Sequence, residues 1–270
     1  MERPKIAKYV FEVSGKEWIT PHYIRIKLRA DENIAFDQCT LGANNKIFIP
    51  PAGCKDVLFP EFDPELGAWR YPKEDARPIV RTYTHRSIDP QTKEIAIDFI
   101  DHGDNGPASA WARHAVHGDQ LGVAMKIKKT PHYQQADWYF LIGDATAIPV
   151  ICCILESLPA DAKGYCLIEI PSEADIHPEL THPGFEFQWL LNGHPERGSI
   201  LAPLAKEVEI PEEYIPFAYV AAEYSTVKEL RQYFQEDLYW PNQQYYAFSY
   251  WKAGLAEDFS AAERRLEKES

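Results

Sequence analysis

The chain has 270 residues, of which 45% are hydrophobic and 13% aromatic, so it can bury one large core or two ordinary ones. Its net charge of −13 argues against general binding to nucleic acid, which needs a broad basic face. No apolar run approaches the roughly 20 residues that cross a bilayer, and the first residues lack a signal-peptide pattern, so we expect no membrane insertion.

The five cysteines show no Cys-x-x-Cys spacing, and their odd number favours a reducing compartment over a disulfide framework. We therefore expect a cytoplasmic protein with no bound metal, in which redox chemistry comes from an organic cofactor. His114 and His117 lie three apart on a predicted helix. Without a third ligand nearby in sequence, they fit surface or cap residues better than a metal site.

The first half of the chain is predicted to form short strands separated by turns. These strands cover residues 23–28, 46–49, 79–86, 95–100 and 120–127. Strands at this spacing are typical of an antiparallel barrel. Residues 50–75 contain five prolines and two glycines, and we expect a long surface loop there, a kind of segment that is often a functional lid.

From about residue 136 the pattern changes to alternating strands and helices. Strands are predicted at 138–143, 165–170, 185–191, 217–221 and 244–251, and helical stretches at 147–158, at 200–208 and from Thr226, where Glu229 gives a capping-box spacing. This alternation favours a parallel sheet covered by helices. We predict a barrel domain at 1–135, an α/β domain at 136–254 and a charged helical tail at 255–270, either docked or solvated.

The predicted strand from Arg81 to Arg86 carries the first functional pattern. An arginine can pair bidentately with a pyrophosphate, the ring of Tyr83 can stack on a flat ring, and the Thr84 hydroxyl can bond a ring nitrogen. In an extended strand, Arg81 and Tyr83 share one face, and Thr84 and Arg86 share the other. By itself, this segment fits an ordinary charged edge strand better than a binding site.

A second pattern begins about 20 residues further on. Asn105 and Gly106 form a predicted turn, and Pro107 is suited to the first position of a helix. The start of such a helix offers unpaired backbone N–H groups and a positive dipole end to a phosphate. Any helix start has this property, but the two patterns together form a combination that chance rarely supplies.

A third pattern, residues 143–149, lies at a predicted strand-to-helix junction, where open α/β sheets bind ligands. It has one glycine where the dinucleotide-binding fingerprint has three. With these patterns, the chain resembles the siderophore-interacting proteins, which are flavin-dependent ferric-siderophore reductases of the ferredoxin-reductase-like superfamily, over residues 8–254. The resemblance rests on the order and spacing of Arg81, Tyr83, Thr84, Arg86, Asp98, Phe99, His102, Gly103, residues 106–109, Trp111, Ala112, residues 143–149, Glu223 and residues 250–254.

The resemblance implies a Greek-key FAD-binding barrel followed by a parallel-sheet domain like those that bind NAD(P)H. The implied cofactor-binding residues are Arg81, Tyr83, Thr84, Arg86, Asp98, His102, Gly106, Pro107, Ala108, Ser109, Asp144, Thr146, Ala147 and Trp251. Arg81, Tyr83 and Thr84 would hold the isoalloxazine and the ribityl-phosphate end of FAD. Asp98 and His102 would lie toward the adenosine, and residues 106–109 would wrap the pyrophosphate, on which residues 144–147 would close.

The implied reaction is the reduction of chelated iron(III) for intracellular iron acquisition, with electrons from NAD(P)H or from ferredoxin. The chain departs from the family pattern at Ala222, where the family usually has glycine, and at Met125 and Lys126, where a Gly-Pro pair is expected. A methyl group at position 222 would obstruct the close approach of a nicotinamide nucleotide. These departures concern the electron donor more than the flavin.

Tris-catecholate iron complexes are anionic, so a local basic pocket in an acidic protein would attract and orient them. Lys252, Lys126 and Lys128 are the candidate substrate-binding residues, although Lys126 and Lys128 also fit a solvated strand end. Two other functions stay open: a general NAD(P)H–flavin or ferredoxin-type reductase, and a non-catalytic ferric-siderophore-binding flavoprotein. We expect a monomer.

Overall fold

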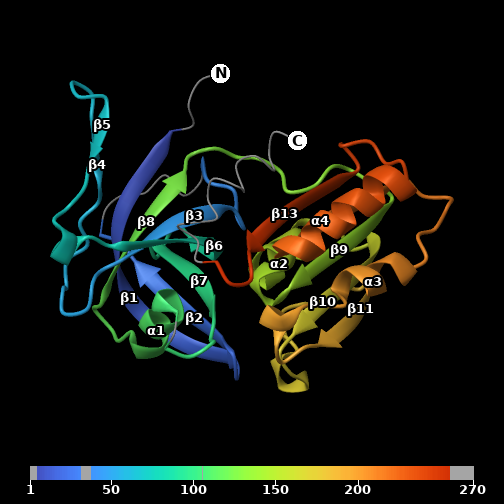
Figure 1. Ribbon diagram of the computed structural model, residues 1–270, viewed down its shortest axis with the longest axis horizontal. Helices are drawn as coiled ribbons and strands as arrows, with labels where there is room; N and C mark the ends of the chain where they lie inside the picture. Colours follow the sequence, from blue (N-terminus) through green and yellow to red (C-terminus); the bar gives the residue numbers. More distant parts are fainter. Residues whose placement is uncertain (1–4, 32–37, 105, 256–270) are drawn as a thin grey trace. The chain divides into compact units, whose positions relative to one another are not determined.

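The computed structural model describes residues 5–31, 38–104 and 106–255. The chain divides into two compact units, Met1–Thr130 and Pro131–Ser270. The two units are coloured blue to green and green to red in Figure 1. The predicted helical tail at 255–270 lies outside the described residues except for Leu255, which forms an isolated bridge with Lys252.

Six antiparallel strands form a closed barrel in the first unit (Figure 1). They are β1 (Ile6–Thr20), β2 (Tyr23–Arg29), β3 (Asn44–Ile49), β6 (Ile79–Asp89), β7 (Glu94–Ile100) and β8 (Gln120–Lys126). Their order around the barrel is β1-β2-β7-β6-β3-β8, which is a Greek-key arrangement because β2 pairs with β7 and β3 lies between β6 and β8. Inward-facing side chains such as Phe11, Ile26, Ile97 and Leu121 form its buried hydrophobic core. The predicted barrel is confirmed.

The longest strand, β1, was missed by the sequence patterns. Of its 15 residues, only Phe11, Val13 and Thr20 are buried, so no regular alternation marks it. Its middle contains Ser14 and Gly15, which look like a turn in the sequence but lie at a shift in the β1–β2 register. A bulge of this kind lets one long strand bend around the barrel.

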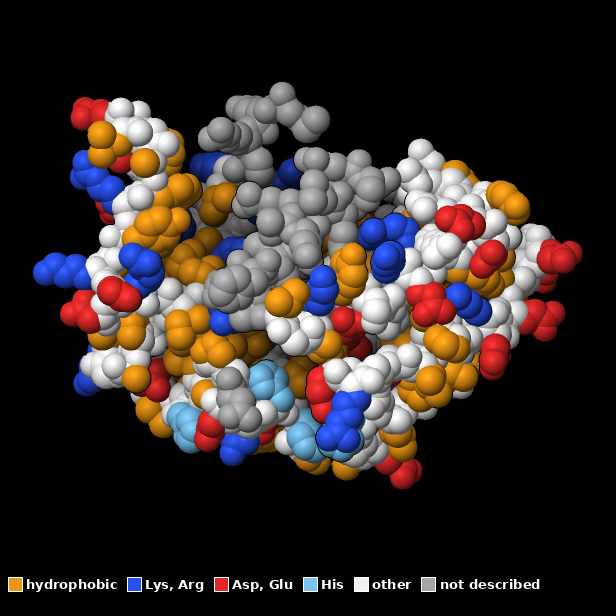
Figure 2. All heavy atoms as spheres, viewed as in Figure 1, with side chains coloured by type: hydrophobic (Ala, Val, Ile, Leu, Met, Phe, Trp, Pro, Cys, Tyr) orange, Lys and Arg blue, Asp and Glu red, His pale blue; other side chains and the backbone are white. Residues whose placement is uncertain are grey.

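The predicted loop at 50–75 contains a small hairpin of β4 (Glu61–Asp63) and β5 (Ala68–Arg70) and a 3-10 turn, η2 (Glu74–Ala76). Figure 2 shows hydrophobic side chains gathered on this hairpin, at the upper left of the view. Phe62, Leu66 and Trp69 are among the exposed hydrophobic residues. The Lys8 ammonium lies 5.1 Å from the centre of the Trp69 ring and so ties the hairpin to the barrel.

The second unit is a five-stranded sheet whose strand order is β11-β10-β9-β12-β13. Its elements are β9 (Trp138–Asp144), η3 (Ala145–Ala147), α2 (Ile148–Ser157), β10 (Lys163–Ile170), η4 (Glu173–Asp175), β11 (Phe185–Leu191), η5 (Pro195–Arg197), α3 (Leu201–Glu207), β12 (Pro216–Glu223), α4 (Tyr224–Gln232), the π-helical turn η6 (Tyr233–Asp237) and β13 (Tyr245–Trp251). All paired strands run parallel, as predicted. Every residue of the central strand β9 is buried, as expected where helices cover both faces.

Helix α4 begins two residues earlier than the sequence indicated. Its N-cap is Glu223, whose carboxylate accepts the backbone N–H of Ser225 at 2.6 Å. The predicted capping box from Thr226 to Glu229 is therefore wrong, because Thr226 lies inside the first turn and is buried. A carboxylate at the N-cap satisfies an unpaired N–H group and favours the positive end of the helix dipole.

Within the described part of the chain, no helix is both long and apolar enough to cross a membrane.

Candidate functional site

In the barrel, Arg81 and Tyr83 lie on β6, which pairs with β3 on one side and β7 on the other. The Tyr83 ring packs on Phe99 of β7 with centroids 4.5 Å apart, and Phe99 is 5.7 Å from Trp111 of α1 (Pro107–His114). The Arg81 guanidinium donates to the backbone carbonyl of Val80 at 2.7 Å. Tyr83 is half-buried and packs against the barrel core. Its stacking on the flavin stays a prediction.

The part of β6 from Thr84 to Arg86 is its buried part. Thr84, His85 and Arg86 are three consecutive buried residues, and the register between β6 and β7 shifts between His85 and Ser87. The Thr84 hydroxyl donates to the Asn44 side-chain oxygen at 3.2 Å. Arg86 lies at this bulge, where the simple two-residue alternation of a strand is interrupted, so the shared face predicted for Thr84 and Arg86 stays a prediction.

Asp98 lies on β7 and forms a bidentate ion pair with Arg25 of β2. The Arg25 Nε and Nη2 atoms donate to its two carboxylate oxygens at 2.7 and 2.9 Å. Asp98 is 4% exposed, so this pair is a buried contact across the β2–β7 register. Its contact with the adenosine side of FAD stays a prediction, and the ion pair gives it a structural role that the sequence patterns did not indicate.

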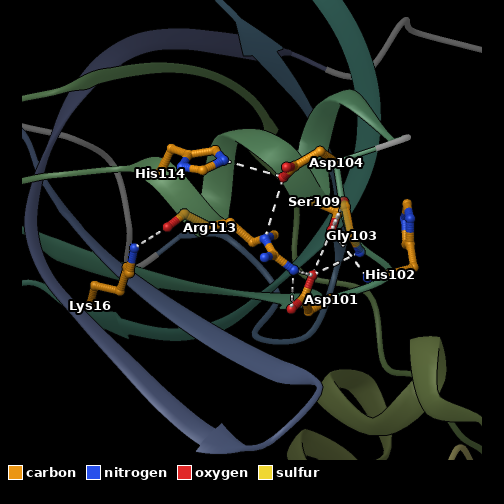
Figure 3. Close-up of polar contacts among 8 residues, drawn as sticks. All are labelled: Lys16, Asp101, His102, Gly103, Asp104, Ser109, Arg113 and His114. Carbon is orange, nitrogen blue, oxygen red and sulfur yellow. Dashed lines mark hydrogen bonds and ion pairs between the residues drawn. The ribbon is translucent and has the colours of Figure 1, made fainter.

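Asp101 is the centre of a hydrogen-bonded cluster that joins the end of β7 to α1 (Figure 3). Its carboxylate accepts from the backbone N–H of Gly103 at 3.0 Å, from the Ser109 hydroxyl at 3.1 Å and from the Arg113 guanidinium at 3.1 Å. Burial acts to raise the pKa of Asp101, but these hydrogen bonds and the Arg113 charge outweigh it and hold the pKa below its ordinary value.

Ser109 belongs to the same cluster and is completely buried. Its hydroxyl accepts from the backbone N–H of His102 at 3.1 Å and shares its one proton between the Asp101 carboxylate at 3.1 Å and the carbonyl of Gly103 at 2.8 Å. The Ser109 side chain therefore bonds within its own segment, and a contact between Ser109 and a pyrophosphate stays a prediction. Asp101 was absent from the predicted site, since nothing in its local sequence distinguishes it from Asp98.

The start of α1 fits the pyrophosphate of a dinucleotide cofactor. Its N-cap is Gly106, which supplies no side chain to bond the first N–H groups, and the Gly106 carbonyl accepts from the backbone N–H of Ala110 at 2.8 Å. A Cβ atom on Gly106 would lie 2.0 Å from Cε1 of His102, so only glycine lets the imidazole lie against the backbone. His102 points away from the Asp101 cluster in Figure 3. An uncapped helix start beside an exposed histidine suits an anion.

The opposite end of α1 is held by Lys16 of β1. Its ammonium donates to the carbonyls of Arg113 and Ala115 at 2.6 and 3.2 Å. A cation at this position satisfies carbonyls that have no helical partner and favours the negative end of the dipole. The orientation of α1 is thus fixed at both ends.

In the second unit, Asp144 lies at the carboxyl end of β9 and is 5% exposed. Its Oδ1 atom accepts from the backbone N–H and the hydroxyl of Thr146, at 2.9 and 2.5 Å. Its Oδ2 atom accepts from the indole N–H of Trp251 at 2.7 Å. Burial raises the pKa of Asp144 above its ordinary value, although Thr146, Trp251 and the backbone N–H of Glu223 all donate to it.

The strand ends beside Asp144 bring Glu223, Trp251 and Lys252 into one cluster. Glu223 and Trp251 are partners in the β12–β13 register, and the second Glu223 oxygen accepts from the backbone N–H of Ala253 at 3.2 Å. The Lys252 ammonium lies 4.5 Å from the centre of the Tyr224 ring. Glu223 was noted in the sequence only as part of the resemblance, and its clamp on Ala253 has no sequence signal.

The other predicted lysines lie in the barrel unit. Lys126 ends β8, where it pairs with Ile6 of β1, and Lys128 follows two residues later. Both side chains are exposed. Their part in substrate binding stays a prediction.

Ala147 is buried in the turn η3, and Gly143 before it approaches that turn closely. A Cβ atom on Gly143 would lie 2.5 Å from Cβ of Ala147 and 3.1 Å from the carbonyl of Ala221. The single glycine of the 143–149 pattern is therefore needed for packing between β9, β12 and the helix start. The Ala222 side chain lies in the core under α3 and α4, so its methyl group does not face the strand ends.

Among the described residues, the side chains of Cys152, His177 and Glu179 bring three potential metal-ligand atoms within 4.8 Å. His177 Nδ1 accepts the backbone N–H of Glu179 at 3.3 Å. A metal-binding histidine usually donates through the nitrogen that does not bind the metal. In His177 the Nδ1 atom accepts a hydrogen bond, whereas the second ring nitrogen of a metal-binding histidine would donate one. This direction indicates a structural histidine.

Comparison with known proteins agrees with this architecture. A family described as "Siderophore-interacting FAD-binding domain" matches residues 12–125, and one described as "Siderophore-interacting protein" matches residues 136–254. Ferric vibriobactin reductase ViuB of Vibrio cholerae is 29% identical over 93% of this chain and 92% of its own length.

Solved structures show the same relationship. The siderophore-interacting protein SipS from Aeromonas hydrophila aligns with a TM-score of 0.81 and 29% identity, covering 97% of this chain and 98% of that one. The ferredoxin reductase of carbazole 1,9a-dioxygenase aligns with a TM-score of 0.63 at 13% identity over 93% of this chain and 71% of that one, a likeness of fold alone. Since the two family matches together cover most of its residues, the chain belongs to the siderophore-interacting protein family.

Proposed function

We propose that this protein is a flavin-dependent oxidoreductase that reduces the iron(III) of a ferric siderophore and thereby releases iron(II) in the cytoplasm. The observation that carries this proposal is the uncapped start of α1 inside the segment that matches a siderophore-interacting FAD-binding domain. The name of the relative ViuB, ferric vibriobactin reductase, supports the same reaction. Five free cysteines agree with a reducing compartment.

The barrel residues hold and orient FAD in this proposal. Arg81 pairs with the phosphate side, Tyr83 offers its half-buried ring to the isoalloxazine, and the backbone N–H groups of Ala108 and Ser109 bind the pyrophosphate. When bound, FAD supplies single electrons to iron(III). Iron(II) is a weaker partner for hard oxygen ligands, so the reduced complex loosens and another chelator takes the metal.

The electron donor in this proposal is NAD(P)H or ferredoxin. The burial of the Ala222 methyl group in the core removes one objection to a nicotinamide nucleotide at the ends of β9 and β12. Parallel sheets bind such ligands where the strand order reverses, which here is between β9 and β12. Anaerobic reduction of the purified protein by NADH, NADPH and reduced ferredoxin, each in turn, identifies the donor.

Purified protein is expected to be yellow, with flavin absorbance near the stoichiometry of one FAD per chain. After anaerobic reduction, addition of a ferric tris-catecholate with an iron(II) trap should reoxidise the flavin and colour the trap. Protein that binds no flavin contradicts the proposal. Flavin that reduces dyes or free flavin but not chelated iron would favour a general reductase, and flavin that no donor reduces would favour a non-catalytic binding protein.

Lys252→Ala is expected to weaken binding of a ferric tris-catecholate by about fivefold at low ionic strength, because the anionic complex loses a nearby cation. The loss should shrink as salt is added, since the Debye length falls to about 10 Å at 0.1 M. Titration calorimetry at two salt concentrations measures both effects. Lys228→Ala, which removes an exposed lysine of α4, is the matched control. Equal losses in both variants would remove Lys252 from the pocket.

A further inference from the structure

The last residue of β13 and the two residues that follow it are tied back to the sheet at three points. The Trp251 indole N–H is bonded to Asp144, the Ala253 backbone N–H is bonded to Glu223, and the Lys252 ammonium lies over Tyr224. These contacts come from the ends of β9 and β12 and the start of α4. The chain turns sharply here, because Gly254 has a φ of 75° and Lys252 bridges to Leu255.

Asp144 is poorly suited to the cofactor contact that the resemblance implies. Its two oxygens are directed at Thr146 and Trp251, and little of the side chain is exposed. An ionised carboxylate would also repel a pyrophosphate. The hydrogen bonds point instead to a role within the second unit, in which Asp144 acts on the ligand through Trp251.

We propose that Asp144 and Glu223 are positioning residues for Trp251–Ala253, and that through this segment they hold Lys252 where it meets the anionic ferric chelate. The inference rests on the proposed function, because that function assigns the chelate to Lys252. It adds two residues that touch neither the chelate nor the flavin. It also explains why a buried carboxylate stands at the end of β9, since the indole donor needs an acceptor there.

A carboxylate fits this role better than an amide. Asp144 accepts at both oxygens, so it satisfies the Thr146 donors and the indole N–H together. In Asp144→Asn, the single amide oxygen is needed as the acceptor for the Thr146 donors. The amide NH₂ group then faces the indole N–H, so that two donors oppose each other. The Trp251 ring is then expected to lose its anchor while the volume at position 144 is unchanged.

The first test reads the contact itself and does not depend on the proposed function. The chain has 7 tryptophans, so the ¹⁵N-labelled holoprotein gives a small set of indole resonances. Trp251→Phe identifies the Trp251 resonance by its loss. In Asp144→Asn this resonance should shift and its proton should exchange faster with solvent. An unchanged shift and exchange rate in Asp144→Asn would overturn the inference.

The second test is a double-mutant cycle on ligand binding. The probe is gallium(III) held by a hexadentate tris-catecholate, which has the charge of the iron(III) complex and is not reduced. Calorimetry on the holoprotein is expected to show about tenfold weaker binding for Asp144→Asn, a range typical of residues coupled through a shared contact. In the Trp251→Phe background, which has no indole N–H, Asp144→Asn should cause almost no further loss.

Glu169→Gln is the matched control for the cycle. Glu169 lies beside Asp144 in the β10–β9 register and is equally buried, but its carboxylate accepts from the Ser199 hydroxyl. Glu169→Gln should leave the affinity for the gallium complex unchanged. Glu223→Gln, which weakens the acceptor for Ala253, should reduce the affinity for the gallium complex. In the Lys252→Ala background, Glu223→Gln should cause little further loss.

The outcomes separate the two proposals. If the unmodified holoprotein does not bind the gallium complex, the proposed function fails and this inference fails with it. If it binds and Asp144→Asn binds equally well, the inference alone is overturned. Equal losses in the presence and absence of the indole N–H would also overturn it, because Asp144 would then act on binding without Trp251.

Discussion

Asp98→Ala is expected to lower the free energy of unfolding of the barrel unit by about 3–5 kcal/mol, because it leaves the Arg25 guanidinium buried without its bidentate partner. The Arg25 side chain is 12% exposed and that of Asp98 is 1% exposed, so water cannot replace the lost acceptor easily. Urea unfolding followed by circular dichroism at a fixed FAD concentration measures the change.

The double variant Arg25→Met with Asp98→Leu should recover most of that stability, since apolar residues of similar volume need no partner. This variant also tests the predicted contact of Asp98 with FAD. A folded double variant that retains FAD would assign Asp98 to structure alone, whereas a folded one that releases FAD supports the contact. If Asp98→Ala unfolds at the same urea concentration as the parent, the buried ion pair has no structural importance.

Arg81→Ala is expected to weaken FAD binding by roughly 10–100-fold, the effect of losing a charge-assisted hydrogen bond worth about 1.5–3 kcal/mol. Arg81 is half-buried on β6 between strands that pair on both sides, so its backbone position should not change. The measurement is the flavin that remains with the protein after dilution and filtration, read from the 450 nm absorbance.

Arg29→Ala is the control for this prediction, because it removes a positive charge from the same barrel at an exposed position on β2. It should retain FAD as the parent does. Arg81→Lys should recover only part of the affinity, since an ammonium cannot make the paired contacts of a guanidinium. Full FAD retention by Arg81→Ala would exclude Arg81 from the phosphate site.

The fold was predictable where residues were buried in a regular pattern. β2, β7 and the fully buried β9 alternate or run apolar in ways that the structure confirms. β1 was missed because its outward residues and the bulge at Gly15 hide its pattern. The N-cap of α4 was placed wrongly because Thr226 has the residue type and spacing of a cap, whereas Glu223 is fixed as the cap by the end of β12.

The candidate site was predictable only in outline. The helix start at Gly106 was marked by Pro107, and the structure places it as expected. The partners of Ser109 and Asp144 were not predictable, because a hydroxyl or carboxylate does not reveal in sequence whether it faces a ligand or its own loop. Trp251 and Asp144 are 107 residues apart, and only the parallel order of β9, β12 and β13 brings them together.

The cluster around Asp101 has a consequence for how the cofactor is acquired. Gly103, Ser109 and Arg113 all bond to the Asp101 carboxylate, so contacts within the protein tie residues 101–103 to α1. Association with FAD then loses little chain entropy at this segment, and the affinity reflects contacts rather than ordering. Apoprotein stripped of flavin should regain it in a single fast phase, whose rate rises in proportion to the FAD concentration.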